Sequence, residues 1–427
     1  MGTSKASIWS KRAFRGLWMA NAVEHAGHAV AMFAASVAMI TVLDAGETEA
    51  GLVAPLSSAG PLLFGLVAGV AVDRWGRRRT MFAMTWVRAA AYGWGAAAFC
   101  LGWLAAWQLL AVLVVVSIAD SFFAAAQTSM LPRLVGRPRI PDAASSLMAT
   151  DQVISLVGPA ASGQLVKLLP APAVLAVSAL TQLAAAVGLA RLPVDDPPPA
   201  KKDRQPVREA IVEGWRFMTG HRLLLAMVLS TATNNFAAGL YQAAESWFIL
   251  KELALDPAVF GAIWSVSAVG GIAGAVVAPR LGRAIGPLRA MLVAGLLMPV
   301  NFALIPLTAL WPQLAVPAIG VSFTLFGLAL GLMSVNGTAL FTQLTPDAML
   351  SRFSATRRTI TQGMFVAGGL LGAVLLTLIG AVPTLWTAVA VALVQSVFLL
   401  RMGVPRRGGP LPAELPAGTP GSDRISA

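Results

Sequence analysis

The sequence predicts an all-α membrane protein in which twelve transmembrane helices form two related six-helix halves around a central cavity. Two observations carry this prediction. Of the 427 residues, 57% are hydrophobic and only 12% are charged, and the mean hydropathy is +0.74. Long apolar segments also recur along nearly the whole chain, at the length of about 20 residues that a bilayer requires. A soluble domain carries about 25% charged residues, so this composition excludes one.

The first expected span follows a polar, basic start. Residues 1–13 contain Lys5, Lys11 and Arg12, and an apolar stretch then extends to about Leu43. That stretch is much longer than the apolar core of a secretory signal, and no small-residue cleavage site ends it. We therefore interpret it as a membrane helix rather than a leader peptide that is removed.

Eleven further apolar segments follow, separated by charged residues, Gly or Pro. Those longer than about 20 residues imply tilted or protruding helices. The twelve expected spans are roughly 14–43, 51–72, 80–103, 107–131, 143–168, 172–192, 222–250, 257–278, 288–309, 313–342, 354–380 and 383–402.

The basic residues orient these spans. With the N-terminus placed in the cytoplasm, 28 of the 31 Lys and Arg residues fall in cytoplasmic segments, and the exceptions are Arg88, Lys167 and Lys251. This asymmetry is typical of multi-pass proteins of the cytoplasmic membrane, and it places both termini inside. Because the net charge of +12 is spread over many connections, it does not indicate a surface that binds nucleic acid.

The longest connection divides the chain. It begins with the stiff polar run 195–199, and apolar residues then recur at helical spacing, which predicts an amphipathic helix on the membrane surface. Those residues are Val207, Ile211, Trp215 and Met218. The expected organisation is a cytoplasmic N-terminus (1–13), an N-terminal six-helix half (14–192), a cytoplasmic linker with the amphipathic helix (193–221), a C-terminal six-helix half (222–402) and a disordered cytoplasmic tail (403–427).

A short internal repeat relates the two halves. Under a shift of 206 residues, the segment 69–77 after the second span overlays 275–283 after the eighth, and Arg74, Gly76 and Arg77 coincide with Arg280, Gly282 and Arg283. Two related halves are typical of proteins that rock around a central site in the membrane.

The motif at 69–79, which reads G-x-x-x-D-R-x-G-R-R-R, resembles the signature loop of the major facilitator superfamily. Further strings resemble its proton-coupled drug and siderophore exporters, related to the enterobactin, macrolide and tetracycline efflux proteins. These strings lie at 129–135, 158–163, 213–217 and 343–347, the last followed by Arg352, so the resemblance extends to about Arg401.

Three positions depart from the pattern of that branch. Gly27-His28 stands where the first helix often has Gly-Asp, Ala125-Ala126-Gln127 replaces a Pro-Ala-Arg string, and Ser162-Gly163 replaces Gly-Gly. An acid position that could carry protons in the first helix is therefore changed, which affects the expected substrate and coupling chemistry rather than the fold.

The signature loop has a structural and a functional interpretation. Its arginines serve as positive-inside anchors, and the resemblance implies that the loop also gates the cytoplasmic side. In that role Asp73 would pair with or cap a neighbouring helix, an interaction of roughly 0.3–1 kcal/mol. The predicted gating residues are Asp73, Arg74, Gly76, Arg77 and Arg78.

Glu24 lies about nine residues into the first span, where an ionised group costs roughly 2.5–3.5 kcal/mol. Asn21, Glu24 and His28 follow at spacings of three and four, so they share one helical face. Two interpretations remain open. Glu24 and His28 either bind substrate and exchange protons, or form a static pair that fixes helix packing.

Arg88 and Asp120 lie at matching depths in the third and fourth spans. The spacing favours an ion pair between them, in which Asp120 remains ionised; the alternative is a proton-carrying or substrate-binding Asp120. Arg88 is in either case a polar residue of the expected cavity.

The second half supplies further candidates. Glu245, near the outer end of the seventh span, is either a protonation or substrate site or an interfacial residue beside a tryptophan. The resemblance implies that the seventh and tenth spans line the cavity, so the other expected cavity residues are Tyr241, Asn234, Asn235 and Asn336. An isolated membrane asparagine is more often helix glue, worth about 0.6 kcal/mol.

No catalytic triad, phosphate-binding loop or clustered His/Cys pattern occurs, and Cys100 is the single cysteine, so we expect no enzyme activity, metal or cofactor. We expect a monomer that exchanges protons for a lipophilic small molecule, such as a drug or natural product, and contacts membrane lipids. The alternatives are a siderophore exporter, an importer of the same fold, and a non-transporting sensor or scaffold.

Overall fold

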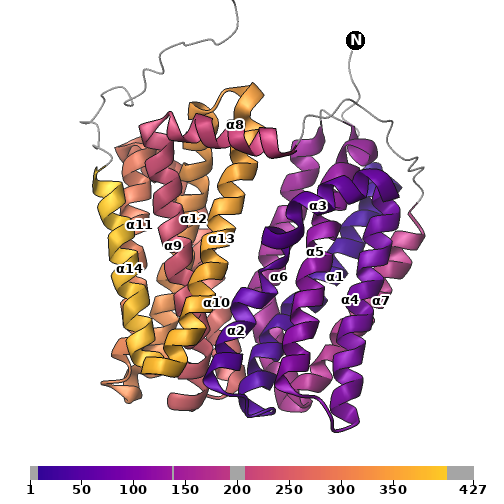
Figure 1. Cartoon of the computed structure of the whole chain (residues 1–427), viewed down its shortest axis with the longest axis vertical. Coiled ribbons are helices and arrows are strands. Elements are labelled where there is room, and N and C mark those ends of the chain that lie inside the picture. The colour runs from indigo at the N-terminus through magenta and orange to yellow at the C-terminus, as the bar shows by residue number, and fades with distance from the viewer. Residues whose placement is uncertain (1–7, 137–138, 193–206, 402–427) are drawn as a thin grey trace, which may run out of the picture.

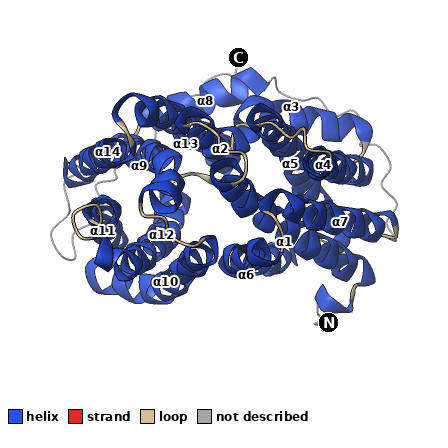
Figure 2. Cartoon of the chain, turned by 90° about the horizontal axis from the view of Figure 1, so that it is seen from below, coloured by secondary structure: helices blue, strands red, loops and turns tan. Residues whose placement is uncertain are grey.

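The computed structural model describes residues 8–136, 139–192 and 207–401, and every regular element in these ranges is a helix. Helices α1 to α7 form one group and α9 to α14 form a second group beside it, while α8 lies across one end (Figure 1). We call these the N-terminal and C-terminal groups, and their two ends the α8 end and the opposite end. Seen along the bundle, the two groups meet where α6 lies beside α10 and α2 lies beside α13 (Figure 2).

The N-terminal group follows a short 3-10 helix at Ile8–Ser10. Prolines at the starts of α3, α6 and α7 suit these positions, since the first turn of a helix needs no donor from them. The helices are α1 (Arg12–Thr41), α2 (Glu47–Ser57), α3 (Gly60–Trp75), α4 (Arg77–Cys100), α5 (Ala106–Val135), α6 (Ile140–Leu168) and α7 (Ala171–Ala190).

The C-terminal group follows α8 (Val207–Thr219), which lies where the sequence predicts an amphipathic helix. Asp256 begins α10 as its N-cap, because its carboxylate accepts bonds from two backbone amides at 2.8 and 3.3 Å. The helices are α9 (Arg222–Trp247, continued by a π-helical turn at Phe248–Glu252), α10 (Pro257–Ile285), α11 (Pro287–Leu307), α12 (Ala315–Leu344, after a 3-10 turn at Pro312–Leu314), α13 (Asp347–Ile379) and α14 (Ala381–Arg401).

Nine of the described helices are long and apolar enough to cross a bilayer: α1, α5, α7 and α9 to α14. The chain is therefore an all-helical, multi-pass protein, and the count of twelve spans remains a prediction. The predicted tail, the first part of the linker and most of the N-terminal segment lie outside the described residues.

The second expected span, 51–72, is two helices rather than one. The break falls at Ser58–Ala59, between α2 and α3. Pro61 contributes to it, because a proline has no N–H to donate to the carbonyl four residues earlier in a continuous helix. The Gly60 amide instead donates to Ser117 Oγ of α5 at 2.9 Å. A span that is apolar throughout is thus divided by one backbone constraint.

The internal repeat is displaced by one helical turn from the predicted overlay. Gly76 forms the α3–α4 turn with φ +85° and ψ 144°, a conformation that glycine alone adopts easily. The matching turn between α10 and α11 is at Gly286, with φ +88° and ψ 147°, whereas Gly282 lies inside α10. The alignment of the two Arg-x-Gly-Arg strings is therefore wrong by four residues, because Gly286 and not Gly282 corresponds to Gly76.

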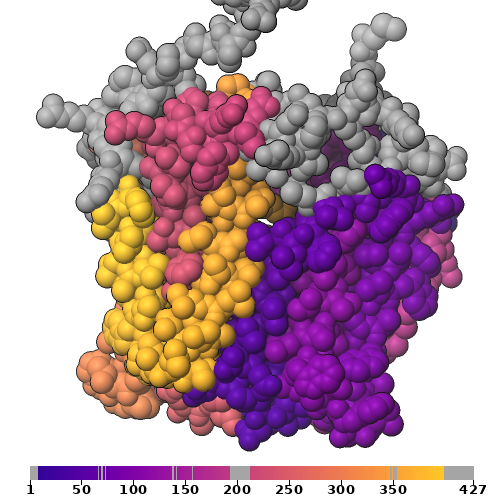
Figure 3. Space-filling view, viewed as in Figure 1, coloured from indigo at the N-terminus to yellow at the C-terminus, as the bar shows by residue number. Residues whose placement is uncertain are grey.

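Polar contacts between the two groups lie at the opposite end. Lys251 Nζ is 2.6 Å from Asp44 Oδ1, and Lys167 Nζ is 3.6 Å from Asp256 Oδ1. The space-filling view shows the groups in contact along the lower half of the molecule (Figure 3). The ribbons separate toward the α8 end (Figure 1). The molecule is closed at the opposite end by residues from both groups.

Glycines allow that close approach. A Cβ added at Gly51 of α2 would lie 2.8 Å from the Ala373 Cα of α13, and one at Gly163 of α6 would lie 2.9 Å from the Ala258 Cα of α10. Small residues at helix crossings let backbones pack closely in a membrane. The largest buried apolar cluster includes residues of both groups, so the opposite end is also where the core joins them.

Candidate functional site

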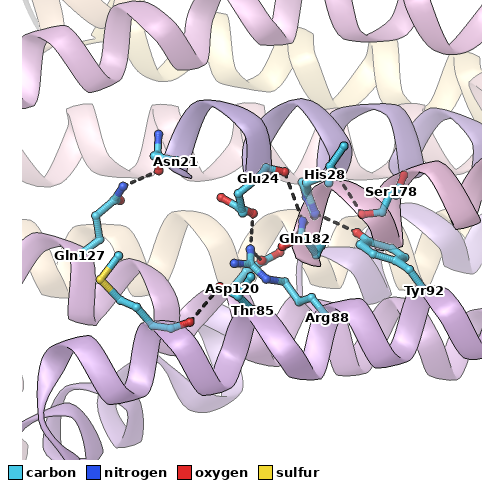
Figure 4. Close-up of polar contacts among 12 residues, drawn as sticks. Asn21, Glu24, His28, Thr85, Arg88, Tyr92, Asp120, Gln127, Ser178 and Gln182 are labelled. Atoms are coloured by element: carbon cyan, nitrogen blue, oxygen red, sulfur yellow. Dashed lines mark hydrogen bonds and ion pairs between the residues drawn. The ribbon is translucent and has the colours of Figure 1, made fainter. Parts of the chain in front are cut away.

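A buried ion-pair cluster lies inside the N-terminal group. The Arg88 guanidinium donates through one nitrogen to Glu24 Oε1 and to Asp120 Oδ1, the latter at 2.6 Å (Figure 4). Its side chain is 1% exposed, against 4% for Glu24 and 28% for Asp120. The predicted Arg88–Asp120 ion pair is present, and Glu24 shares it. Because a charge so buried is costly without partners, Arg88 fixes α1, α4 and α5 together.

His28 contacts the exposed side of this cluster. Its Nδ1 is 3.1 Å from the Tyr92 hydroxyl and 3.6 Å from Asp120 Oδ2, while Glu24 turns to Arg88 instead (Figure 4). The Glu24–His28 pair that the helical spacing suggested is therefore replaced by contacts to other helices.

Amides extend the polar contacts along α1. Asn21 donates to Asp151 Oδ1 of α6 at 3.1 Å and accepts a bond from Gln127 of α5. Gln182 of α7 donates to the Glu24 carbonyl at 3.2 Å. Sequence reasoning assigned no role to Tyr92 or Gln182. Tyr92 follows Arg88 by one helical turn, and Gln182 is a lone amide in an apolar helix, so both carried a usable signal.

A second candidate site lies between the two groups. A cavity of about 270 Å³ is lined by α1, α2 and α6 on one side and by α9 and α10 on the other. Glu245, Gln242 and Trp264 form part of its C-terminal wall. The same three residues line a smaller pocket, of about 30 Å³, inside the C-terminal group. Glu245 thus lies at the boundary between the two spaces.

The surroundings of Glu245 differ from those of Glu24. Glu245 is 3% exposed, and no described residue forms an ion pair or hydrogen bond with its carboxyl group. Aromatic rings surround the smaller pocket, where Tyr241 stacks on Phe302 with ring centroids 4.4 Å apart. The Glu245 carboxyl group is therefore buried beside aromatic rings without a described partner.

The predicted cavity asparagines serve mainly to join helices. Asn336 Nδ2 donates to the Leu332 carbonyl at 3.0 Å and reaches the Ala278 carbonyl of α10 at 3.5 Å. Asn235 donates to the Thr361 carbonyl of α13 at 3.0 Å. Asn234 is buried. Two of the three therefore act as packing contacts between α9, α10, α12 and α13.

The signature loop forms the α3–α4 turn at the α8 end. Arg78 donates to the carbonyls of Leu189, at 3.3 Å, and Ala190, which end α7. A cation at the C-terminus of a helix is favourable because the last carbonyls lack helical partners. Arg74 is exposed and Arg77 is partly buried, whereas the Asp73 side chain lies outside what the structure describes. The gating role of these residues remains a prediction.

No group of three or more His, Cys, Asp or Glu residues within the described ranges could hold a metal ion. The apolar helices, the buried polar cluster and the cavity between two helix groups are the features of a multi-pass membrane protein with a central cavity.

The chain belongs to the Major Facilitator Superfamily, whose family model matches residues 17–241. None of the curated protein sequences matches it.

Several solved transporters share the fold. A mutant of the nucleoside transporter NupG has a TM-score of 0.75 at 12% identity, covering 92% of this chain and 100% of its own. A bacterial homologue of the iron transporter ferroportin, in an inward-facing state, has a TM-score of 0.74 at 16% identity, covering 91% and 98%. A POT family transporter in complex with 5-aminolevulinic acid has a TM-score of 0.72 at 13% identity, covering 92% and 96%. Such identities show the fold alone.

Proposed function

We propose that the protein is a secondary active transporter that exports a lipophilic small molecule from the cytoplasm in exchange for protons. Twelve spans in two six-helix halves would alternate access to the cavity between the N-terminal and C-terminal groups. Both termini would lie in the cytoplasm, so the α8 end would face inward. Since the groups touch at the opposite end, the arrangement resembles an inward-facing state.

The observation that carries this proposal is Glu245. It is buried at the wall of the cavity between the groups, and no described residue neutralises its carboxyl group. A bare carboxylate is costly in a membrane, so such residues favour binding a proton or a cationic ligand. Competition between the two at one site would couple them. A cationic or neutral lipophilic substrate fits a pocket of one acid and several aromatic rings.

The N-terminal cluster supports a different role. Because Glu24 is held by Arg88, it is a weaker candidate for the coupling group than Glu245, although both were predicted. Asp120 and His28 lie at the more exposed edge of the cluster, with His28 Nδ1 3.6 Å from Asp120 Oδ2. We assign Glu24 and Arg88 to the positioning of α1 against α4 and α5.

The test is substrate efflux under an imposed pH gradient, first with a panel of lipophilic dyes and drugs, with and without an uncoupler. Glu245→Gln keeps the shape of the side chain but cannot release a proton, so driven efflux should collapse while substrate binding persists and loses its pH dependence. The matched control is Glu252→Gln, at the end of the same helical segment, which should behave as wild type. Unchanged driven efflux in Glu245→Gln would contradict the proposal, and uptake instead of efflux would reverse its direction.

A further inference from the structure

A groove of about 300 Å³ lies between the first half of α1 and the last turns of α7, and none of its described lining residues also lines the cavity beside Glu245. The two helices pack against each other and lie side by side in Figure 2. Gly16 of α1 and Gly188 of α7 line the groove, at a close approach of the two helices. A Cβ at Gly16 would lie 3.0 Å from Leu192 Cδ2.

The groove is positively charged at one end. Arg12 and Arg191 line it, both are exposed, and no described residue forms an ion pair or a side-chain hydrogen bond with either. Among the described residues that line the groove, none is a carboxylate. Two unneutralised guanidinium groups beside one cavity favour an anion with several oxygens, since arginine binds phosphate in a bidentate manner.

The rest of the groove is apolar. Met19 and Val23 line it on α1, and they are 60% and 38% exposed. From Arg12 to Val23 the helix rises about 16 Å, at 1.5 Å per residue. That length is close to half of the roughly 30 Å hydrocarbon core of a bilayer. A free phosphate would use only the basic end, whereas a lipid would use both parts.

We propose that this groove binds one anionic phospholipid, with its phosphate between Arg12 and Arg191 and one acyl chain along Met19 and Val23. The site is independent of the proposed transport activity, because it lies outside the cavity between the groups. Its lipid would hold the basic ends of α1 and α7 together at the membrane surface.

The experiment is native mass spectrometry of the purified full chain, titrated with phosphatidylglycerol, phosphatidylcholine or inorganic phosphate. We expect one phosphatidylglycerol to bind at least about ten-fold more tightly than phosphatidylcholine, given two charge-assisted contacts. The double variant Arg12→Gln/Arg191→Gln should lose this preference. The control Arg15→Gln/Arg79→Gln removes the same charge from exposed arginines outside the groove and should keep it.

Three results would overturn the proposal. They are equal binding of the two lipids, loss of the preference in the control variant, and displacement of phosphatidylglycerol by inorganic phosphate at similar concentrations. The last would indicate a phosphate site without a lipid. If the glutamine double variant does not fold, Arg12→Lys/Arg191→Lys retains both charges but not the bidentate geometry. A preference weakened by at least about three-fold in that variant supports the site, and an unchanged one contradicts it.

Discussion

Arg88 holds two carboxylates that belong to different helices and differ in burial. Glu24 is almost fully enclosed, whereas Asp120 is 28% exposed. Water can therefore stabilise the Asp120 charge in part, but the charge on Glu24 depends on Arg88. The guanidinium also lies over the Phe123 ring, 4.5 Å from its centroid, which adds a favourable contact for a cation.

Removal of this cation should be the most damaging change in the cluster. Arg88→Gln leaves two carboxylates facing each other, and we expect a loss of roughly 3–5 kcal/mol of stability. Glu24→Gln and Asp120→Asn should cost less, because each leaves Arg88 paired with the other carboxylate and the pair has no net charge. Asp120→Asn should cost least, because Asp120 is the more exposed of the two. Thermal unfolding in detergent measures the order. An Asp120→Asn variant less stable than Arg88→Gln would show that the cluster does not depend on Arg88.

Asp44 provides a pH-dependent contact in the connection between α1 and α2. The hydrogen-bonded Lys251 ammonium lowers the pKa of the Asp44 carboxyl group below its ordinary value of 3.8. The pair should therefore favour closure of the opposite end at any pH above about 3.8, and lose that effect as the pH falls through the lowered pKa. Between pH 5 and 8 its contribution should be constant.

The measurement is the distance between spin labels placed on the two groups at the opposite end, in a Cys100→Ser background. Asp44→Asn should open that end slightly at pH 7, and salt should reproduce the change in the unaltered protein, since exposed pairs are screened. If opening in wild type changes steeply between pH 5 and 8 and is abolished by Asp44→Asn, this assignment is wrong.

At the scale of elements, the connections were harder to predict than the helices. Apolar length alone located the helices, because a membrane span needs about 20 such residues whatever their order. The break at Ser58–Ala59 and the turn at Gly286 depend on where a proline or glycine falls within a turn. Hydropathy contains no information on where the proline or glycine falls. The short internal repeat placed the second turn at Gly282 instead of Gly286.

Alanine substitutions at two glycines, one in the α3–α4 turn and one inside α3, should change the stability in opposite directions. Gly76→Ala should cost about 1–3 kcal/mol, since its φ of +85° is strained for any other residue. Gly65→Ala, inside α3 with open space around its Cβ position, should instead stabilise by roughly 0.5–1 kcal/mol. Both can be compared by thermal unfolding. Equal effects at the two positions would mean that the backbone at Gly76 is not constraining.

In the candidate sites, too, some features could be predicted from the sequence and others could not. The polar residues of α1 and the depths of Arg88 and Asp120 pointed to one cluster, because helical spacing and depth follow from residue number. The partner of Glu24 could not be obtained in this way, since it depends on how α1 rotates against α4. The aromatic pocket beside Glu245 likewise combines α9, α10, α11 and α12, whose packing only the structure supplies.

For the whole molecule, closure of the opposite end depends on glycines where α6 crosses α10. Gly163→Leu would place a side chain where a Cβ already lies 2.9 Å from the Ala258 Cα. Overpacking of this kind costs about 1–3 kcal/mol. Each group should remain folded, and the strain should be relieved by separation of the two groups at that end.

Accessibility of a cavity residue would report this opening. In a Cys100→Ser background, Ser36→Cys lies in the lining of the 270 Å³ cavity. We expect Gly163→Leu to increase the rate at which this cysteine reacts with a membrane-impermeant maleimide, applied from the side of the membrane at which the opposite end lies. Gly65→Leu should leave that rate unchanged. An equal rate in the Gly163→Leu variant would place the closing contact elsewhere.

Because the two helix groups are in contact at the opposite end, a small rotation there produces a large displacement at the α8 end. The 33 residues of α13 span about 50 Å at 1.5 Å per residue. A rotation of about 10° about the closed end would therefore move the far end of such a helix by roughly 9 Å, while atoms near the pivot move by little more than a bond length. In such a rotation, small adjustments among a few glycines and ion pairs would produce a large displacement at the α8 end, without any helix having to unfold.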